Sequence, residues 1–92
     1  MNFEWDGRKA VANTHKHGVT FHEAATVFGD PLSMTFYDPD HSQRERRFIT
    51  IGMSIKDRIL MVAHADTRGG VRIISARKLT KNERKEYERN TK

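Results

Sequence analysis

The 92-residue sequence contains no cysteine, which excludes the disulfide framework of small secreted domains and a zinc site built on thiolates. Long apolar runs are missing too, since none approaches the ~20 residues that a membrane-spanning helix needs. The opening residues, MNFEWDGRKA, lack the apolar stretch of a signal peptide. Apolar residues make up only 36% of the chain. We therefore expect a cytoplasmic protein that folds as a single domain over residues 1–92 around a thin core.

Charge is plentiful but unevenly placed along the chain. Residues 1–45 contain 4 Lys/Arg and 7 Asp/Glu, a net charge of −3, whereas residues 46–92 contain 13 and 5, a net charge of +8. This asymmetry favours a polyanion or an acidic protein as the partner of the second half. A solvated basic surface without a ligand is the alternative.

The first third of the sequence predicts a short strand and two helices. MNFEW alternates apolar and polar residues, as a strand does, and Asp6 is placed to cap a helix that runs to about His17. A second helix follows in VTFHEAATVFGDP, where Thr20 and Glu23 have the spacing of a capping box. Both helices carry apolar residues that can pack against a sheet.

From Met34 onward the apolar period changes to two. MTFYD, RRFITIGMS, RILMVAHA and VRIISARK are rich in β-branched and aromatic residues, and turn residues separate them, so they predict four consecutive antiparallel strands. Thr80 and Glu83 form another capping box, which opens a last helix with almost no apolar face. The order β-α-α-β-β-β-β-α predicts an α+β domain, an antiparallel sheet with helices packed against one face.

Several segments together resemble the BrnT family of type II toxins. They are FEWDGRKAVANTHKHGVTFHEAATVFGDP, the loop DPDHS, RFITIGMS and RGGVRIISARKLTKNERKEYE, and they span nearly the whole chain. The motifs KHGV, IISAR and the Thr-x-x-Glu-Arg that follows carry most of the resemblance. It implies a RelE-like fold and a ribonuclease that cleaves RNA and arrests translation. It also implies a BrnA-like ribbon-helix-helix antitoxin, in a hetero-oligomer such as a 2:2 heterotetramer that binds operator DNA through the antitoxin.

Cleaving RNA without a metal requires a base for the 2′-OH proton, positive charge on the phosphate and an acid for the departing 5′-oxygen. Arg77 ends an otherwise apolar strand and is the first candidate for the phosphate, with an ion pair to Glu83 or Asp57 as its structural alternative. His64 is the only histidine of the basic half and a candidate base or acid. A hydrogen-bonded strand histidine is the other interpretation of His64.

The relation between these residues depends on the register of two strands, which the sequence leaves open. Arg72 and Arg77 are an odd number of residues apart, so on a regular strand they point to opposite faces of the sheet. The length of the turn near Arg68 decides which of the two shares a face with His64, because one step of register exchanges them.

Further candidates come from the turn, the last helix and the remaining basic residues. Arg68, Arg72 and Tyr87 complete the catalytic set that begins with His64 and Arg77. Tyr87 enters by analogy with RelE-like toxins, which often place a tyrosine of the C-terminal helix in the active site, and an anchor for the helix is the alternative. The candidates for RNA binding are Arg46, Arg47, Arg58, Lys78, Lys81, Arg84 and Lys85, for which a solvated surface is equally compatible with the pattern.

No metal or cofactor is expected. His15 and His17 are two residues apart and do not share a helix face, and His41 in DPDHS suits a loop-shaping role. Together with the ribonuclease activity that the resemblance implies, this leads us to expect a metal-independent endoribonuclease. A non-catalytic module that binds nucleic acid, or pairs with a transcription regulator through the same basic face, is the alternative.

Overall fold

The computed structural model describes residues 1–90, and its order of elements is the one that the sequence predicts. The elements are β1 (Asn2–Glu4), α1 (Gly7–His17), α2 (Phe21–Thr26), the 3-10 helix η1 (Val27–Gly29), β2 (Met34–Tyr37), the 3-10 helix η2 (Pro39–His41), β3 (Arg47–Met53), β4 (Ile59–Thr67), β5 (Gly70–Lys78) and α3 (Lys81–Asn90). The α+β class is confirmed. Among residues 1–90, no helix has both the length and the apolar character needed to cross a membrane.

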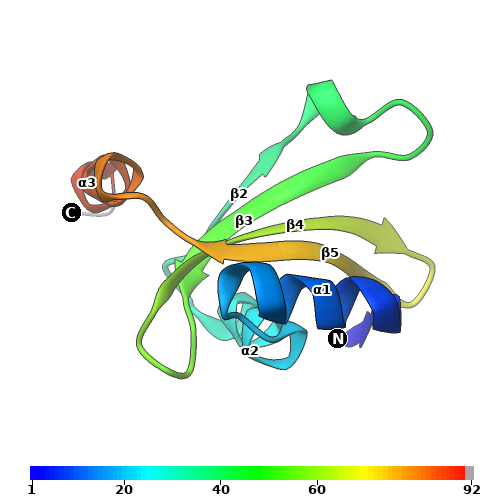
Figure 1. The fold of residues 1–92 in the computed structure, drawn as a ribbon. Coiled ribbons are helices and arrows are strands. Elements are labelled where there is room, and N and C mark those ends of the chain that lie inside the picture. Colours follow the sequence, from blue (N-terminus) through cyan, green and yellow to red (C-terminus); the bar gives the residue numbers. More distant parts are fainter. Residues whose placement is uncertain (91–92) are drawn as a thin grey trace.

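One five-stranded sheet, with strand order β1-β5-β4-β3-β2, organises the chain (Figure 1). Strands β2 to β5 form the expected antiparallel meander, and β1 adds a parallel edge beside the start of β5. Past the end of β1, the side chain of Asn13 on α1 takes over this edge. It accepts a hydrogen bond from the backbone N–H of Ala76 at 3.0 Å and donates to the Ala76 carbonyl at 2.8 Å. One helical side chain thus satisfies both backbone groups of Ala76 on the edge of β5.

Helices α1 and α2 begin where the sequence predicts. Asp6 accepts from the backbone N–H groups of Arg8 and Lys9, and Thr20 accepts from that of Glu23 at 3.1 Å. Only this half of the Thr20–Glu23 capping box forms, because the Glu23 carboxylate instead accepts hydrogen bonds from Ser54 and Arg58 in and beside the β3–β4 turn. Glu23 therefore joins α2 to the sheet.

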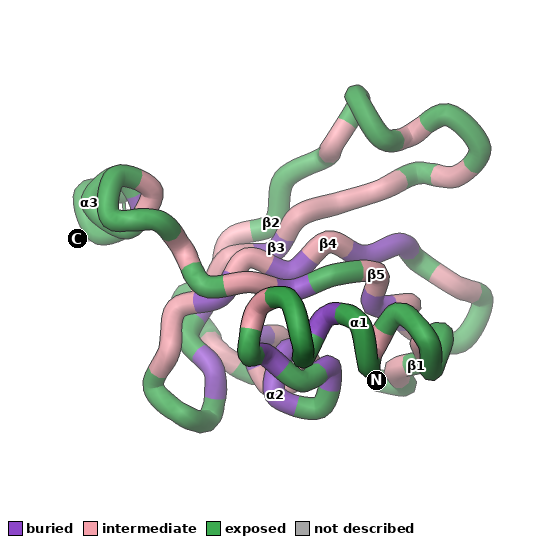
Figure 2. The backbone as a smooth tube through the Cα atoms, in the orientation of Figure 1, coloured by how far each residue is buried: buried purple, intermediate pink, exposed green. Residues whose placement is uncertain are grey.

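The hydrophobic core lies between α1, α2 and one face of the sheet, where the buried residues gather (Figure 2). Its members are Val19, Phe21, Ala24, Val27, Leu60, Val62, Ile73 and Ala76. The opposite face of the sheet, here called the outer face, carries no such layer in the described chain.

Helix α3 contradicts the expectation that all helices share one face. Its Tyr87 lines a cavity with Met34, Phe36, Ile51 and Met61, all of them on the outer face. The helix stands away from the body of the molecule (Figure 1). A helix with so few apolar residues has little to bury, which explains why it does not join the core.

A β-bulge settles the register that the sequence left open. Ala63 pairs with Ser75 and His64 pairs with Ile73, so Ile74 is the extra residue of β5. Because of this extra residue, Arg72 pairs with Ala65 and Arg77 pairs with Met61. Ala65 and Met61 are four residues apart on β4 and share a face, so Arg72 and Arg77 both point to the outer face. His64 pairs with the buried Ile73 and points into the core, so it shares a face with neither arginine. Both registers considered from the sequence were wrong, because each assumed a regular strand.

Candidate functional site

A groove of about 490 Å³ crosses the outer face. Its floor consists of small and apolar strand residues, and its rim consists of charged and titratable side chains from α1, the β2–β3 connection, β3 and β5. The lining residues are Lys16, His17, Asp38, His41, Arg47, Ile49, Met61, Ala63, Ile74, Ser75, Ala76 and Arg77. The bulge contributes directly, since it turns the neighbouring residues Ile74 and Ser75 toward the same groove.

An imidazole–carboxylate pair stands at the rim of this groove. The side chain of His41 is 67% exposed, and its Nδ1 lies 2.8 Å from Oδ2 of Asp38, which is only 16% exposed. A carboxylate on Nδ1 orients the ring and leaves Nε2 free to exchange a proton with a ligand. The pair forms because Pro39 starts η2, which places Asp38 and His41 one turn apart.

Arg77 occupies the α3 end of the groove. Its guanidinium donates two hydrogen bonds to Glu83, from Nη1 to Oε1 at 2.7 Å and from Nη2 to Oε2 at 2.9 Å. The pKa of Glu83 falls from 4.5 to about 2 because Arg77 and the backbone of Thr80 stabilise its charged form. The sequence offered Glu83 or Asp57 as the structural partner of Arg77, and the ion pair is with Glu83. The same planar fork would bind two oxygens of a phosphate.

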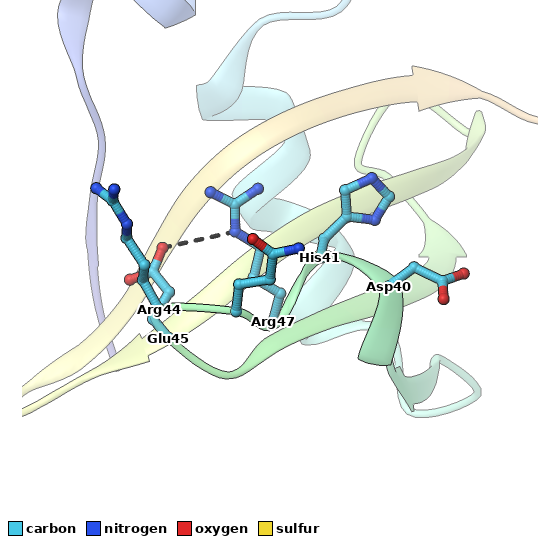
Figure 3. A pocket seen from close by; sticks show the side chains of 6 residues that line it. Asp40, His41, Arg44, Glu45 and Arg47 are labelled. Atoms are coloured by element: carbon cyan, nitrogen blue, oxygen red, sulfur yellow. Dashed lines mark ion pairs between the residues drawn. The ribbon is translucent and has the colours of Figure 1, made fainter.

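The other end of the groove continues into a cavity of about 530 Å³ beneath the β2–β3 connection. His41 and Arg47 line both cavities. In Figure 3 the Arg47 guanidinium and the His41 ring point to the same side of the loop, and a dashed line marks the ion pair of Arg47 with Glu45. Glu45 also accepts a hydrogen bond from Arg72, which holds the pKa of this carboxyl below its usual range.

His64 lies outside the groove. It is 4% exposed, its ring packs edge-on against Phe28 and stacks on Phe48, and its Nε2 lies 2.7 Å from Oγ1 of Thr50. Burial lowers the pKa of His64, because the loss of water around the charged ring outweighs the attraction of Asp66, which raises the pKa. A catalytic role for His64 remains a hypothesis from sequence, and its position beneath the helices gives no route for RNA.

The other predicted residues divide into three groups. Arg58 donates to the Glu23 carboxylate and to the Gly18 carbonyl, and thus holds α2. Arg46 lies over the rings of Tyr37 and Phe48, 5.5 Å from each centroid. The rest lie away from the groove, on the exposed β4–β5 turn, at the end of β5 and on α3, and they are Arg68, Lys78, Lys81, Arg84, Lys85 and the buried Tyr87.

Sequence reasoning missed the residues that the chain brings to the groove from its acidic half. They are Lys16 and His17 at the end of α1, and the pair Asp38 and His41. The motif DPDHS contained a signal, since an acid and a histidine three residues apart can share one helical turn. Within residues 1–90, no cluster of three His, Cys, Asp or Glu side chains could hold a metal ion.

Comparison with known proteins identifies the fold and the family. A family model described as "Ribonuclease toxin, BrnT, of type II toxin-antitoxin system" matches residues 5–83. The crystal structure of the Brucella abortus ribonuclease toxin BrnT superimposes with a TM-score of 0.64 at 21% sequence identity, over 88% of this chain and 99% of that one. No curated protein matches the sequence.

Proposed function

The chain belongs to the BrnT family of ribonuclease toxins of type II toxin–antitoxin systems, and from this premise we propose that it cleaves RNA in the outer-face groove and so arrests translation. One observation carries the proposal. The Asp38–His41 pair and the guanidinium of Arg77 line the same groove, so a proton acceptor and a phosphate ligand face one bound strand.

In the proposed reaction, Nε2 of His41 removes the proton of a ribose 2′-OH. The 2′-oxygen attacks the adjacent phosphorus, the bond to the 5′-oxygen breaks, and a 2′,3′-cyclic phosphate and a 5′-hydroxyl result. The departing 5′-oxygen needs a proton, and His17 is the second histidine on the groove that can supply one. Asp38 keeps the ring of His41 in place and stabilises its charge after it takes the proton.

Arg77 is the proposed ligand of the scissile phosphate. As the 2′-oxygen attacks, negative charge builds up on the oxygens of the phosphate. A guanidinium therefore stabilises the transition state more than it stabilises the ground state. In the free chain, the guanidinium of Arg77 is hydrogen-bonded to Glu83. When RNA binds, a phosphate of the RNA replaces the Glu83 carboxylate as the partner of Arg77. Because Glu83 lies on the weakly packed α3, a small movement of that helix is enough to release it.

The same proposal includes the absence of a metal requirement and a cytoplasmic location. Histidine and arginine supply proton transfer and positive charge, which are the two tasks that a divalent cation performs in metal-dependent nucleases. RNA and ribosomes, the targets of a toxin that stops translation, lie in the cytoplasm.

We further propose that a BrnA-like ribbon-helix-helix antitoxin covers the outer face and carries the operator DNA contacts of the complex. Residues 46–92 have a net charge of +8, which favours an acidic partner segment. A cavity of about 350 Å³ between α3 and the sheet offers apolar contacts beside Arg77, from Met34, Phe36, Ile51, Met61 and Tyr87. An antitoxin helix laid there would block access to Arg77, which explains inhibition by occlusion.

Single-turnover cleavage of RNA in EDTA tests the proposed reaction. We expect His41→Ala to slow cleavage by ~10²–10⁴, the usual contribution of general acid–base catalysis. His15→Ala is the matched control, because His15 is an exposed histidine of α1 that does not line the groove. Cleavage by His41→Ala at the parental rate, or complete loss of parental cleavage in EDTA, would contradict the proposal.

A further inference from the structure

Resting on the proposed function, we propose that Arg47 and Arg72 form a second phosphate subsite, which binds a backbone phosphate of single-stranded RNA at the end of the groove remote from Arg77. This subsite extends the groove and does not take part in the bond cleavage itself.

The sheet places the two arginines as a pair. Arg47 on β3 and Arg72 on β5 both lie opposite Ala65 of β4, so they flank one small buried residue across three strands. Nothing on Ala65 separates the two side chains, because its methyl group is too short to rise between them. This pairing depends on the bulge at Ile74, without which Arg72 would point into the core.

An anion already occupies the position between these arginines. The Glu45 carboxylate accepts a hydrogen bond from Arg72 through Oε2 and lies 3.6 Å from Nε of Arg47 through Oε1. That second distance is too long for a hydrogen bond, and the buried Nε of Arg47 has no hydrogen-bond partner in the described chain. A buried donor that the internal carboxylate does not satisfy indicates an incomplete site, and the two non-bridging oxygens of a backbone phosphate, spread on a larger tetrahedral group, can reach both arginines.

Glu45 is able to leave. It belongs to the irregular segment between η2 and β3, outside any helix or strand, and its side chain is 34% exposed. A phosphate monoanion replaces one negative charge by another, so the two arginines remain neutralised to the same extent while Glu45 moves into water. In the free chain, Glu45 thus holds the subsite in place and competes with RNA for it.

The spacing of the two subsites sets the length of the ligand. Arg77 lies opposite Met61, and Met61 and Ala65 are four residues apart on β4, which corresponds to ~13 Å along the strand. Stacked nucleotides advance ~3.4 Å each, so about four of them span this distance. His41 and Arg47 line both the cavity with Glu45 and the groove with Arg77, so the two subsites belong to one continuous surface that includes His41. The ligand is a single strand, since in-line attack by a 2′-oxygen needs backbone freedom that a duplex lacks.

Binding of uncleavable RNA tests the subsite separately from the reaction. Oligonucleotides with 2′-O-methyl groups lack the attacking hydroxyl, so their affinity does not depend on catalysis. We expect an eight-nucleotide strand to bind the parental protein more tightly than a dinucleotide. Arg72→Gln should weaken binding of the long strand about tenfold and leave the dinucleotide unchanged, because only the long strand reaches this subsite. In Arg72→Gln, the slope of the logarithm of the binding constant of the long strand against the logarithm of the salt concentration should fall in magnitude by ~0.7, the value for one lost phosphate contact.

Glu45→Gln should have the opposite effect to Arg72→Gln. A gain in affinity cannot result from a loss of stability, so this variant tests the subsite even if Arg72→Gln is destabilised. Removing the competing charge should tighten binding of the long strand about tenfold, again without effect on the dinucleotide. The control for Glu45→Gln is Glu86→Gln, which breaks the ion pair of Arg89 on α3. The control for Arg72→Gln is Arg8→Gln, which removes one cation away from the groove. A Glu45→Gln variant that behaves as Glu86→Gln would overturn the subsite, as would equal effects on both lengths or equal affinity for a hairpin duplex. If the parental protein binds neither length, the proposed function fails together with the subsite.

Discussion

His41 and His64 carry the same imidazole in opposite surroundings, and the surroundings decide what each ring can do. His41 is exposed at a groove and held by a carboxylate, whereas His64 is enclosed by two phenyl rings and a threonine hydroxyl. A ring with Nδ1 buried and unpartnered cannot take up a proton without a large desolvation cost. We therefore assign His64 to stability.

The protonation of His64 gives stability a defined pH dependence. Burial lowers the pKa of His64 from 6.5, so the unfolded chain binds its proton more readily than the folded chain does. The contribution of the neutral ring is complete above pH 6.5 and is lost as the pH falls through the lowered pKa. We expect the free energy of unfolding, measured in urea, to decline below pH 6.5 in the parental protein.

The variant His64→Gln keeps a polar group near Thr50 but removes the titration. It should lose ~1 kcal/mol at pH 7 and show a flatter profile between pH 6.5 and 5. His15→Gln should keep the parental slope, since His15 is exposed. A parental slope in His64→Gln would mean that another group causes the decline.

At the scale of elements, capping and periodicity predicted most of the fold, whereas a single bulge determined the site. Asp6, Thr20 and Thr80 begin the three helices as expected, because capping depends on residues within one turn. The bulge at Ile74 has no local signal in VRIISA, since every residue there suits a regular strand. The face on which Arg72 lies therefore could not be predicted. His41 was missed for a related reason, since the groove it joins is assembled from distant segments.

The separation of α3 from the core leaves an apolar surface that the antitoxin can use. Phe36 on β2 is 46% exposed and lines the cavity beneath α3, apart from the groove with His41. We expect Phe36→Asp to weaken antitoxin binding by ~2 kcal/mol or more, as for an apolar anchor at an interface, while RNA cleavage by the free toxin stays at the parental rate. Calorimetry with the antitoxin measures the first and an RNA assay the second. The control is Val11→Asp, because Val11 is an exposed apolar residue on α1. A residue next to Phe36 is not suitable, since Thr35 forms a hydrogen bond with Thr50. Equal losses in Phe36→Asp and Val11→Asp would exclude this surface.

At the scale of the whole molecule, the charge distribution governs association. The basic half carries +8 and the acidic half −3, so the molecule attracts an anionic partner over long range and orients it. We expect the association rate with the antitoxin to fall about tenfold or more between 50 and 500 mM salt, with a smaller change in the dissociation rate. Stopped-flow mixing measures both. Association rates that are independent of salt would indicate that apolar contacts, rather than charge, guide the encounter.

If RNA is cleaved in the groove, Arg77→Ala and Glu83→Gln should differ in their rates of RNA cleavage. Both variants break the same ion pair between β5 and α3, but only Arg77→Ala removes the guanidinium. We expect Arg77→Ala to cleave RNA several hundredfold more slowly than the parental protein, since a transition-state charge contact is worth ~3–4 kcal/mol. Glu83→Gln should cleave at the parental rate or faster, because it frees Arg77 for the phosphate. Parental cleavage by folded Arg77→Ala, or equal losses in the two variants, would contradict the assignment of the active site to this groove.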